Sequence, residues 1–186
     1  MFAQLQLHER LLRALEENNF TEPTPVQQQA IPLILAGRDL RATAQTGSGK
    51  TAAFLLPVLH QLLSAEQSSP ATRVLILVPT RELAGQIMDE VQRFSRYTFL
   101  QAAMLIGGEG FKEQSALLRK VPDILVATPG RLLEHIQAGS LPAGELRWLI
   151  LDEADRMLDL GFADAMQAII AACSNRQQTL LFSATT

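Results

Sequence analysis

Two short polar runs, each directly after an apolar stretch, carry residue types that could hold a nucleoside triphosphate with Mg²⁺. The first is Ala-Gln-Thr-Gly-Ser-Gly-Lys-Thr at 44–51. A glycine-containing turn between a strand and a helix lets backbone N–H groups point at phosphate oxygens, and Lys50 adds an ammonium for the β- and γ-phosphates. Thr51 offers its hydroxyl to the metal.

The second run, Asp-Glu-Ala-Asp at 152–155, supplies the acidic half of such a site. Asp152 would hold Mg²⁺, and Glu153 would orient or deprotonate the attacking water. Lys50, Asp152 and Glu153 are therefore candidate catalytic residues, and Thr51 and Asp152 are candidate metal ligands. This chemistry includes hydrolysis as well as binding.

Each run also has an ordinary interpretation. Residues 47–51 could form a turn followed by an exposed lysine, and Ala44 stands where the general phosphate-loop pattern has glycine. Residues 152–155 could be an acidic helix start, because carboxylates favour the positive end of the helix dipole. The conjunction of both runs, in the correct order and after apolar stretches, favours the nucleotide site.

The composition bounds the class of protein. A chain of 186 residues that is 47% hydrophobic suits a single α/β domain. The formal net charge of −3 gives no bulk case for nucleic-acid binding, so such a function would depend on local arginines. The lone Cys173 is expected to be a buried thiol in a reducing compartment, and the three histidines form no ligand pattern. With no secretory start and no run of membrane-spanning length, we expect a soluble, cytoplasmic protein without a membrane partner.

Short apolar runs alternate with segments of helical periodicity. The expected strands are 40–44, 73–78, 101–106, 123–127, 147–151 and 179–182, and the helices between them include 52–63, 81–94, 131–137 and 164–173. This alternation builds a parallel sheet covered on both faces. We therefore predict a doubly wound α/β domain with a mostly parallel sheet.

A helical appendage is expected before the first strand. Helices over 7–17 and 26–35, joined through Pro23 and Pro25, would form an appendage over 1–38, followed by a sheet core over 39–186. Residues 64–72, rich in Ser, Pro and Glu, are predicted to be an exposed loop.

A polar or glycine-containing cluster follows every expected strand. The clusters are 45–51, 79–82, 107–108, 128–131, 152–155 and 183–185. Ligands of parallel sheets bind outside the carboxyl ends of the strands, so these clusters should converge on one edge of the sheet.

With its clusters in this order, the chain resembles the DEAD-box family of ATP-dependent RNA helicases, specifically their first domain, a RecA-like P-loop NTPase fold. The resemblance covers essentially the whole chain. Residues 19–27 resemble the Q motif, with Phe2 at the position of its upstream aromatic; 44–51 resemble motif I, including its Ala44; 79–84 motif Ia; 107–108 the double-glycine motif; 128–131 motif Ib; 152–155 motif II; and 183–185 motif III.

The resemblance implies that ATP and Mg²⁺ are the cofactors. It assigns ATP binding to Phe20, Pro25, Gln27, Ala44, Gln45, Thr46, Gly47, Ser48, Gly49, Lys50 and Thr51, with Gln27 reading adenine and Phe20 stacking on it. The amide of Gln27 can donate and accept at once, which is the pairing that recognises adenine N6 and N7. Without the resemblance, Phe20 and Phe2 would be core aromatics and Gln27 an ordinary helix-start residue.

The resemblance also implies contacts with single-stranded or duplex RNA. These fall on Pro79, Thr80, Arg81, Gly107, Gly108, Thr128, Pro129, Gly130 and Arg131, which could hold a phosphodiester backbone without reading its sequence. Asp155, Ser183 and Thr185 would couple the ATP state to the RNA grip, through hydrogen bonds to Asp155. The alternatives are solvated or salt-bridged arginines at helix starts, and hydroxyls that cap a strand end.

Two residues depart from the family pattern. Asn19 stands where the family has glycine, a mild change because Asn tolerates positive φ. Arg41 interrupts an apolar strand, and the sequence offers no reason for it.

The chain stops at Thr186, directly after motif III, so the second RecA-like domain with its arginines is expected to be missing. Residues 1–186 should then be a monomeric fragment that binds nucleotide but is nearly inactive. Two other classes stay open. A P-loop kinase acting on a small molecule fits the acidic composition but lacks an arginine-rich lid after the phosphate loop. An interaction module with a vestigial site would need a damaged motif.

Overall fold

The computed structural model describes residues 1–67 and 69–185, and within them six strands form one sheet. The strands are β1 Leu40–Thr43, β2 Val74–Leu77, β3 Ala102–Leu105, β4 Ile124–Ala127, β5 Trp148–Leu151 and β6 Gln178–Ser183. They lie in the order β1-β6-β5-β2-β4-β3, and every pairing is parallel. Each expected strand is therefore present, and the predicted fold class is confirmed.

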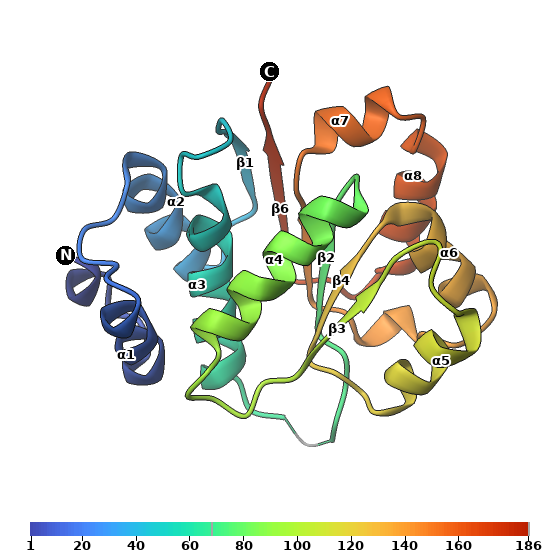
Figure 1. Cartoon of the computed structure of the whole chain (residues 1–186), viewed down its shortest axis with the longest axis horizontal. Coiled ribbons are helices and arrows are strands. Elements are labelled where there is room, and N and C mark those ends of the chain that lie inside the picture. The colour runs from blue at the N-terminus through green and yellow to red at the C-terminus, as the bar shows by residue number, and fades with distance from the viewer. Residues whose placement is uncertain (68, 186) are drawn as a thin grey trace.

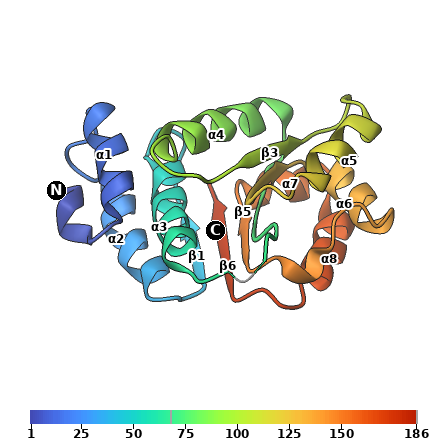
Figure 2. The same ribbon diagram turned by 90° about the horizontal axis from the view of Figure 1, so that it is seen from below.

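Helices cover both faces of the sheet (Figure 1). One side carries α1 Glu9–Glu17, α2 Pro25–Leu35, α3 Lys50–Ser64 and α4 Arg81–Phe94, and the other carries α5 Phe111–Arg119, α6 Pro129–Gln137, α7 Ala154–Asp159 and α8 Ala163–Ala172. Short 3₁₀ turns, η1 Phe2–Leu5 and η2 Ala143–Glu145, complete the described elements. Figure 2 shows the separation from below, with α1–α3 on one side and α6 and α8 on the other.

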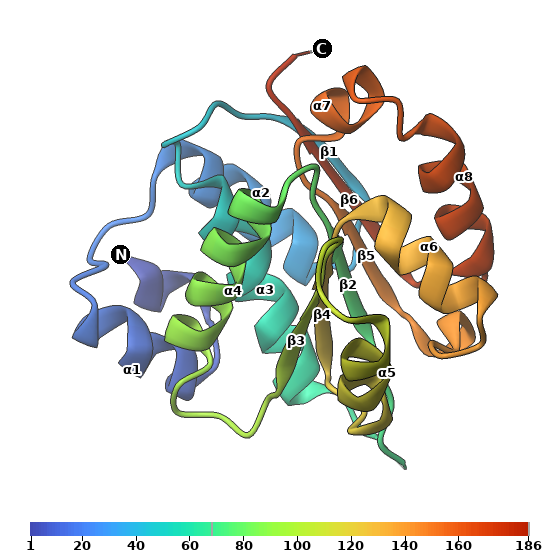
Figure 3. The same ribbon diagram turned by 45° about the vertical axis from the view of Figure 1, so that its right-hand side comes forward.

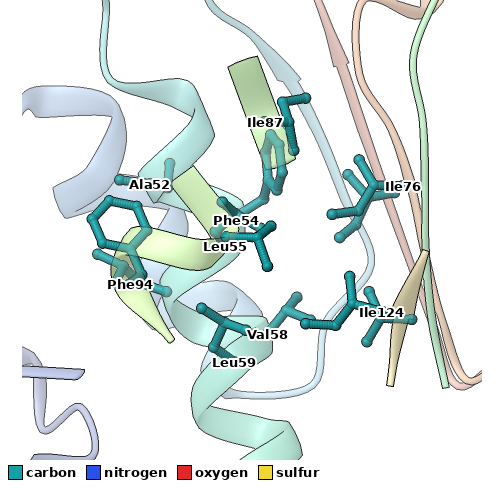
Figure 4. Packing of buried hydrophobic residues seen from close by; sticks show 14 of the residues in the cluster. Ala52, Phe54, Leu55, Val58, Leu59, Ile76, Ile87, Phe94 and Ile124 are labelled. Carbon is teal, nitrogen blue, oxygen red and sulfur yellow. The ribbon is translucent and has the colours of Figure 1, made fainter. Parts of the chain in front are cut away.

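The central strands β2, β4 and β5 lack polar alternation because both of their faces are buried. In β2, Val74 and Ile76 pack into the cluster under α3 and α4, whereas Leu75 and Leu77 pack into the cluster under α6 and α8. Figure 4 shows the first cluster, where side chains of α3 and α4 meet Ile76 and Ile124 of the sheet.

The helix α5 was not expected from the sequence. Only its Gln114 and Leu118 are buried, so its apolar stripe is too narrow to give a clear helical period. The helix α7 has 6 residues and begins at Ala154, so the interpretation of the acidic run at 152–155 as a helix start also holds.

The edge position of β1 explains Arg41. This strand pairs with β6, and its side chains alternate between half-buried and exposed. Leu40 and Ala42 pack against the core, while Arg41 and Thr43 point to the opposite, exposed side. Arginine is tolerated there because an edge strand needs only one apolar face.

The N-terminal appendage shares the core of the sheet. Gln178 on β6 donates from Nε2 to the carbonyl oxygens of Ile34 at 3.0 Å and Arg38 at 2.6 Å. Phe20 packs edge-on against Phe2 and Phe94, with ring centroids 6.4 and 5.5 Å apart. Residues 1–38 are therefore held on the same hydrophobic core as the strands.

Asn19 adopts a φ of 60°, as its side chain allows, and Cys173 is fully buried. Residues 66–67 and 69–70 of the expected loop are exposed, Thr72 is buried, and Ser68 and Thr186 lie outside the described residues. Among the described residues, no helix has both the length and the apolar character needed to cross a bilayer.

A histidine contact between the appendage and α3 makes stability depend on pH. Nδ1 of His60 accepts a hydrogen bond of 2.9 Å from the backbone N–H of His8. Burial, and then the charge of His8, lower the pKa of His60. Because the folded pKa lies below the unfolded value of about 6.5, this contribution is complete above pH 6.5 and is lost as the pH falls below it.

We predict that the free energy of unfolding, measured in urea, decreases as pH falls from about 7 towards 5.5. The decrease should be smaller in His60→Asn, because that side chain binds no proton in this range. Both proteins keep His135, whose pKa burial also lowers, so its contribution cancels in the comparison. Identical slopes in the two proteins would contradict the prediction.

Candidate nucleotide and RNA site

The run 44–51 forms a loop between β1 and α3, at the carboxyl edge of the sheet. Gly47 and Gly49 adopt φ values of 84° and 88°, a region that glycine enters without strain. Ser48 closes the turn by donating from its backbone N–H and its hydroxyl to the carbonyl of Gln45, at 3.2 and 2.6 Å. The loop therefore has the tight geometry that presents N–H groups and a helix N-terminus to an anion.

Lys50 is the first residue of α3 and lies at the base of this loop, only 7% exposed. Its Nζ is 3.0 Å from Oδ1 of Asp152 and 3.5 Å from Oε2 of Glu153. Lys50 and Glu153 are 103 positions apart in the sequence, yet the three candidate catalytic residues lie side by side in the structure.

Asp152 directly follows the buried strand β5 and is completely buried. Burial raises the pKa of its carboxyl, and the nearby Lys50 ammonium opposes that increase. Oδ2 of Asp152 has no hydrogen-bond partner among the described residues. A buried carboxylate oxygen without a donor is suited to a hard cation.

The residues present fit Mg²⁺. Within the described chain no group of three His, Cys, Asp or Glu side chains is arranged to hold a metal on its own. Mg²⁺ usually takes only one or two protein oxygens and fills its shell with water and phosphate oxygens. Asp152 and the hydroxyl of Thr51, which lines the cavity beside Lys50, would be the protein oxygens for such a shell.

Glu153 is held in an unusual backbone conformation. Its φ of 55° lies in the left-handed region, which a residue with a Cβ seldom adopts. Oε2 faces Lys50, while Oε1 lies 3.8 Å from Nη1 of Arg156. Strain of this kind is concentrated at functional sites.

A cavity of about 470 Å³ opens beside Lys50. Its walls include Phe20 and Gln27, as well as Thr46, Gly47, Gly49, Lys50, Thr51 and Glu153. Helix α4 adds Leu83, Gln86 and Glu90, which sequence reasoning missed; their spacing along one helix stripe was the available signal.

Gln27 and its neighbours form the start of α2. Thr24 caps the helix, Pro25 is its first residue, and Gln27 completes a capping box by accepting the Thr24 N–H at 2.9 Å. Nε2 of Gln27 donates to the carbonyl of Gly49 at 3.0 Å, so the side chain also joins α2 to the phosphate loop. Ala44 is buried at the other side of the loop, where its N–H donates to the carbonyl of Ser183 at 2.9 Å.

The candidate RNA residues lie at the same edge, beyond β2, β3 and β4. In Figure 3 the carboxyl edge of the sheet faces upwards, on the side of α7 and the C-terminus. Thr80 caps α4 by accepting the Leu83 N–H, Arg81 is exposed, and its guanidinium lies against Gly108. Pro79 is buried and Gly107 is half-buried.

Residues 128–131 start α6 rather than forming a free loop. Thr128 is the N-cap, Pro129 and Gly130 form the first turn, and Arg131 reaches across to the double-glycine loop. Nη1 of Arg131 donates to the Glu109 carbonyl at 2.7 Å and to Oε1 of Gln114 at 3.0 Å.

Gln114 organises a cluster that sequence reasoning missed. Its Oε1 is 2.9 Å from Nε2 of buried His135, and its Nε2 donates to the Ile106 carbonyl at 2.8 Å. Phe111 stacks on His135 with centroids 4.0 Å apart. No sequence pattern announces this cluster, because its members come together only through the packing of α5 on α6.

The last described residues contact the acidic run. Oδ2 of Asp155 accepts hydrogen bonds from the Thr185 hydroxyl at 3.0 Å and the Ala184 N–H at 3.2 Å. Burial acts to raise the pKa of Asp155, but bonds from Thr185 and from backbone N–H groups outweigh it and hold the pKa below its ordinary value. The Ser183 hydroxyl differs from expectation, since it donates to the Thr185 carbonyl at 2.6 Å and not to Asp155.

Comparison with known proteins agrees with this geometry. A solved ATP-dependent RNA helicase from Sulfolobus tokodaii, described as hypothetical, superposes with a TM-score of 0.88 and 39% identity over 96% of this chain and 51% of its own. The curated "DEAD-box ATP-dependent RNA helicase 28" of Oryza sativa subsp. japonica is 50% identical over 99% of this chain and 23% of its own length. The "Probable ATP-dependent RNA helicase ddx27" of Dictyostelium discoideum is 48% identical over 99% of this chain and 24% of its own length.

The chain spans about a quarter of the length of these curated relatives. The sequence model described as "DEAD/DEAH box helicase" matches residues 24–186, which is most of the chain. The chain therefore belongs to the DEAD/DEAH box helicase family and corresponds to its first RecA-like domain.

Proposed function

We propose that this chain is the ATP- and RNA-binding half of an RNA helicase that couples ATP binding and hydrolysis to local RNA duplex unwinding or remodelling of RNA–protein complexes. The observation that carries the proposal is the position of Lys50, 3.0 Å from Asp152 and 3.5 Å from Glu153 beside a cavity of about 470 Å³. The relatives named ATP-dependent RNA helicases support it, although they are much longer chains.

The residues around Lys50 suit phosphoryl transfer to water. Lys50 would hold the β- and γ-phosphates, and Glu153 would orient the attacking water and take its proton. Asp152 and Thr51 would hold Mg²⁺, whose chemistry when bound is to neutralise charge on the phosphate oxygens. A partner domain would supply the arginines that complete the site.

The hydrogen bonds of Gln27 leave a pattern that matches adenine. A glutamine amide has two N–H donors and two lone pairs on its oxygen. One donor goes to Gly49 and one lone pair to the Thr24 N–H, which leaves one donor and one acceptor. Adenine offers N7 as an acceptor and N6 as a donor, whereas guanine offers two acceptors at the same edge.

The arginines at the sheet edge suit a phosphodiester backbone. Arg81 is exposed beside Gly108, and Nη2 of Arg131 makes no hydrogen bond with any residue that the structure describes. Backbone and hydroxyl groups at Thr80, Thr128 and Gly130 add neutral donors, which position a strand without reading its bases. Cytoplasmic location and a monomeric state stay predictions from the sequence.

The adenine assignment gives the first test of function. Wild type should bind ADP more tightly than GDP in calorimetry, and Gln27→Ala should lose that preference because its donor–acceptor pair is gone. Gln28→Ala is the matched control, since Gln28 bonds to the carbonyl of Pro23 and does not line the cavity. Equal wild-type affinity for ADP and GDP would overturn adenine recognition.

The approach of Gln27 to the phosphate loop gives a second prediction. A Cβ on Gly49 would lie 2.6 Å from Nε2 of Gln27 and 2.8 Å from Oγ1 of Thr24, whereas a Cβ on Gly47 meets no atom within 4 Å. Both glycines have positive φ, so alanine at either position costs about 1–2 kcal/mol of strain. Gly49→Ala should lose about 1 kcal/mol more, because the hydrogen bonds of Gln27 must also break. Urea unfolding measures both values, and equal losses would contradict the steric argument.

A third prediction concerns turnover by residues 1–186 alone. They should bind ADP, bind RNA with a steep loss in added salt, and hydrolyse ATP very slowly even with RNA, since a supplied arginine is worth about 10³–10⁵ in rate. Joining the chain to a second RecA-like domain should restore RNA-stimulated hydrolysis, measured as phosphate release. Rapid RNA-stimulated hydrolysis by residues 1–186 would contradict the need for a second domain.

Glu153→Gln in the protein that carries both domains should keep ATP bound but block turnover, because the amide cannot take a proton from the attacking water. Phosphate release measures this effect, and unchanged hydrolysis would exclude Glu153 from the chemistry.

A further inference from the structure

A buried glutamine on α5 joins two of the segments assigned to RNA. Gln114 is 2% exposed, and its Nε2 donates at 2.8 Å to the carbonyl of Ile106, directly before the double-glycine loop. Its Oε1 accepts at 3.0 Å from Nη1 of Arg131, in the first turn of α6. Figures 2 and 3 show α5 beside α6. One side chain therefore ties the segment after β3 to the segment after β4.

The choice of glutamine at this position is not explained by packing. Gln114 and Leu118 are the two buried residues of α5. A buried amide costs folding free energy unless its polar atoms are paired, and an apolar side chain of similar size would avoid that cost. The amide is therefore explained by the groups that it binds.

The partners of Gln114 leave its amide one orientation. The Ile106 carbonyl can only accept and the Arg131 guanidinium can only donate, so they fix which end of the amide is the oxygen. Nε2 of His135 lies 2.9 Å from this oxygen and must carry the ring proton. Burial and then the charge of Arg131 lower the pKa of His135, against the effect of Glu134, so the ring is neutral at about pH 7. Both lone pairs of the Gln114 oxygen are then occupied.

The guanidinium of Arg131 is held on two sides and free on the third. Nη1 also donates to the Glu109 carbonyl at 2.7 Å, and Nε lies 3.6 Å from Oε1 of Glu134. Within the described residues Nη2 has no hydrogen-bond partner, and the side chain is 16% exposed. An arginine held in this way has already lost the rotamer freedom that a phosphate contact would otherwise cost.

We propose that Gln114 is a positioning residue for RNA binding. It contacts no RNA itself, but it holds Arg131 so that Nη2 stays available to a backbone phosphate, at a fixed distance from the double-glycine loop. Without the amide both segments would be released, and the RNA strand would have to order them on binding. The inference rests on the proposed function, because it takes RNA as the ligand of Arg131.

Residues 1–186 and fluorescein-labelled oligouridine test the proposal by fluorescence anisotropy at low salt. Gln114→Met keeps the length of the side chain but removes its donor and acceptor, so it should weaken binding about three- to tenfold. It should also reduce the slope of log K against log salt by about 0.7, the value for one phosphate contact of a single strand. A neutral side chain displaces no counterions, so this change has to come from a charged neighbour.

A double-mutant cycle tests whether that neighbour is Arg131. Arg131→Met should weaken binding at least as much as Gln114→Met and reduce the salt slope by the same amount. If Gln114 acts through Arg131, the double variant should bind RNA as Arg131→Met does, within about twofold. Effects that multiply in the double variant would overturn the positioning role.

Leu118→Val is the matched control on the same helix. It removes packing one turn away from Gln114 and should lower the free energy of unfolding in urea, but it leaves the hydrogen bonds of Gln114 in place. Its affinity for oligouridine should stay within about twofold of wild type.

ADP affinity, measured by calorimetry, reports whether each variant is folded. It should be unchanged in Gln114→Met and Leu118→Val, because neither residue lines the nucleotide cavity. If Gln114→Met binds no ADP, Gln114→Asn takes its place with the same expectations, since it keeps the amide but withdraws it by one methylene.

Each other outcome overturns the proposal. If Arg131→Met weakens RNA binding while Gln114→Met leaves affinity and slope unchanged, the positioning role is wrong and the proposed function stands. If Leu118→Val weakens binding as much as Gln114→Met, the packing of α5 and not the amide holds the site. If wild type binds no oligouridine, the proposed function is wrong as well.

Discussion

Parallel pairing of every strand is the constraint on which the site depends. Because β1 to β6 all run in the same direction, the segments that follow them lie along one edge of the sheet. The phosphate loop after β1, the acidic run after β5 and the segment after β6 become neighbours although 139 positions separate Ala44 from Ser183. No single loop holds all the required groups.

The buried ion pair of Lys50 and Asp152 makes the carboxyl edge of the sheet suited to charged ligands. Taking an ammonium and a carboxylate out of water is expensive, and their attraction offsets this cost only partly when a carboxylate oxygen has no other donor. Removal of Lys50 alone would leave Asp152 buried and unpaired, a change of about 3–5 kcal/mol for such pairs. The pair is therefore better understood as an electrostatic site for an anion and a cation than as a source of stability.

Sequence reasoning succeeded where chemistry is local. The strands were visible as apolar runs, and the order of the polar runs after them predicted that Lys50, Asp152 and Glu153 would lie together, as they do. It failed where contact depends on packing. Nothing in the sequence shows that Gln27 reaches Gly49, that Gln114 bridges Arg131 and His135, or that Ser183 bonds to Thr185 and not to Asp155.

Arg41 and Phe99 show a related limit. In the sequence, each is a residue of the wrong polarity for its segment, one charged in a strand and one apolar in a connection. Arg41 is explained by an edge that only the sheet order reveals. Phe99 stays exposed after folding, and its contact is with the guanidinium of Arg10 on α1, which no sequence pattern shows.

The contacts at the carboxyl edge form a closed ring, which determines how a change at the phosphates can spread. The Ala44 N–H bonds to Ser183, the Thr185 hydroxyl bonds to Asp155, and Glu153 in the same run faces Lys50 at the start of the helix after Ala44. Lys50 lies near both Asp152 and Glu153, so it cannot exchange these carboxylates for phosphate oxygens without changing the charge that Glu153 experiences. Glu153 has a φ of 55°, and its relaxation would move the adjacent start of α7, which carries Asp155. The segment 183–185 is therefore the part of the ring in which we expect the charge state of the cavity to become a displacement.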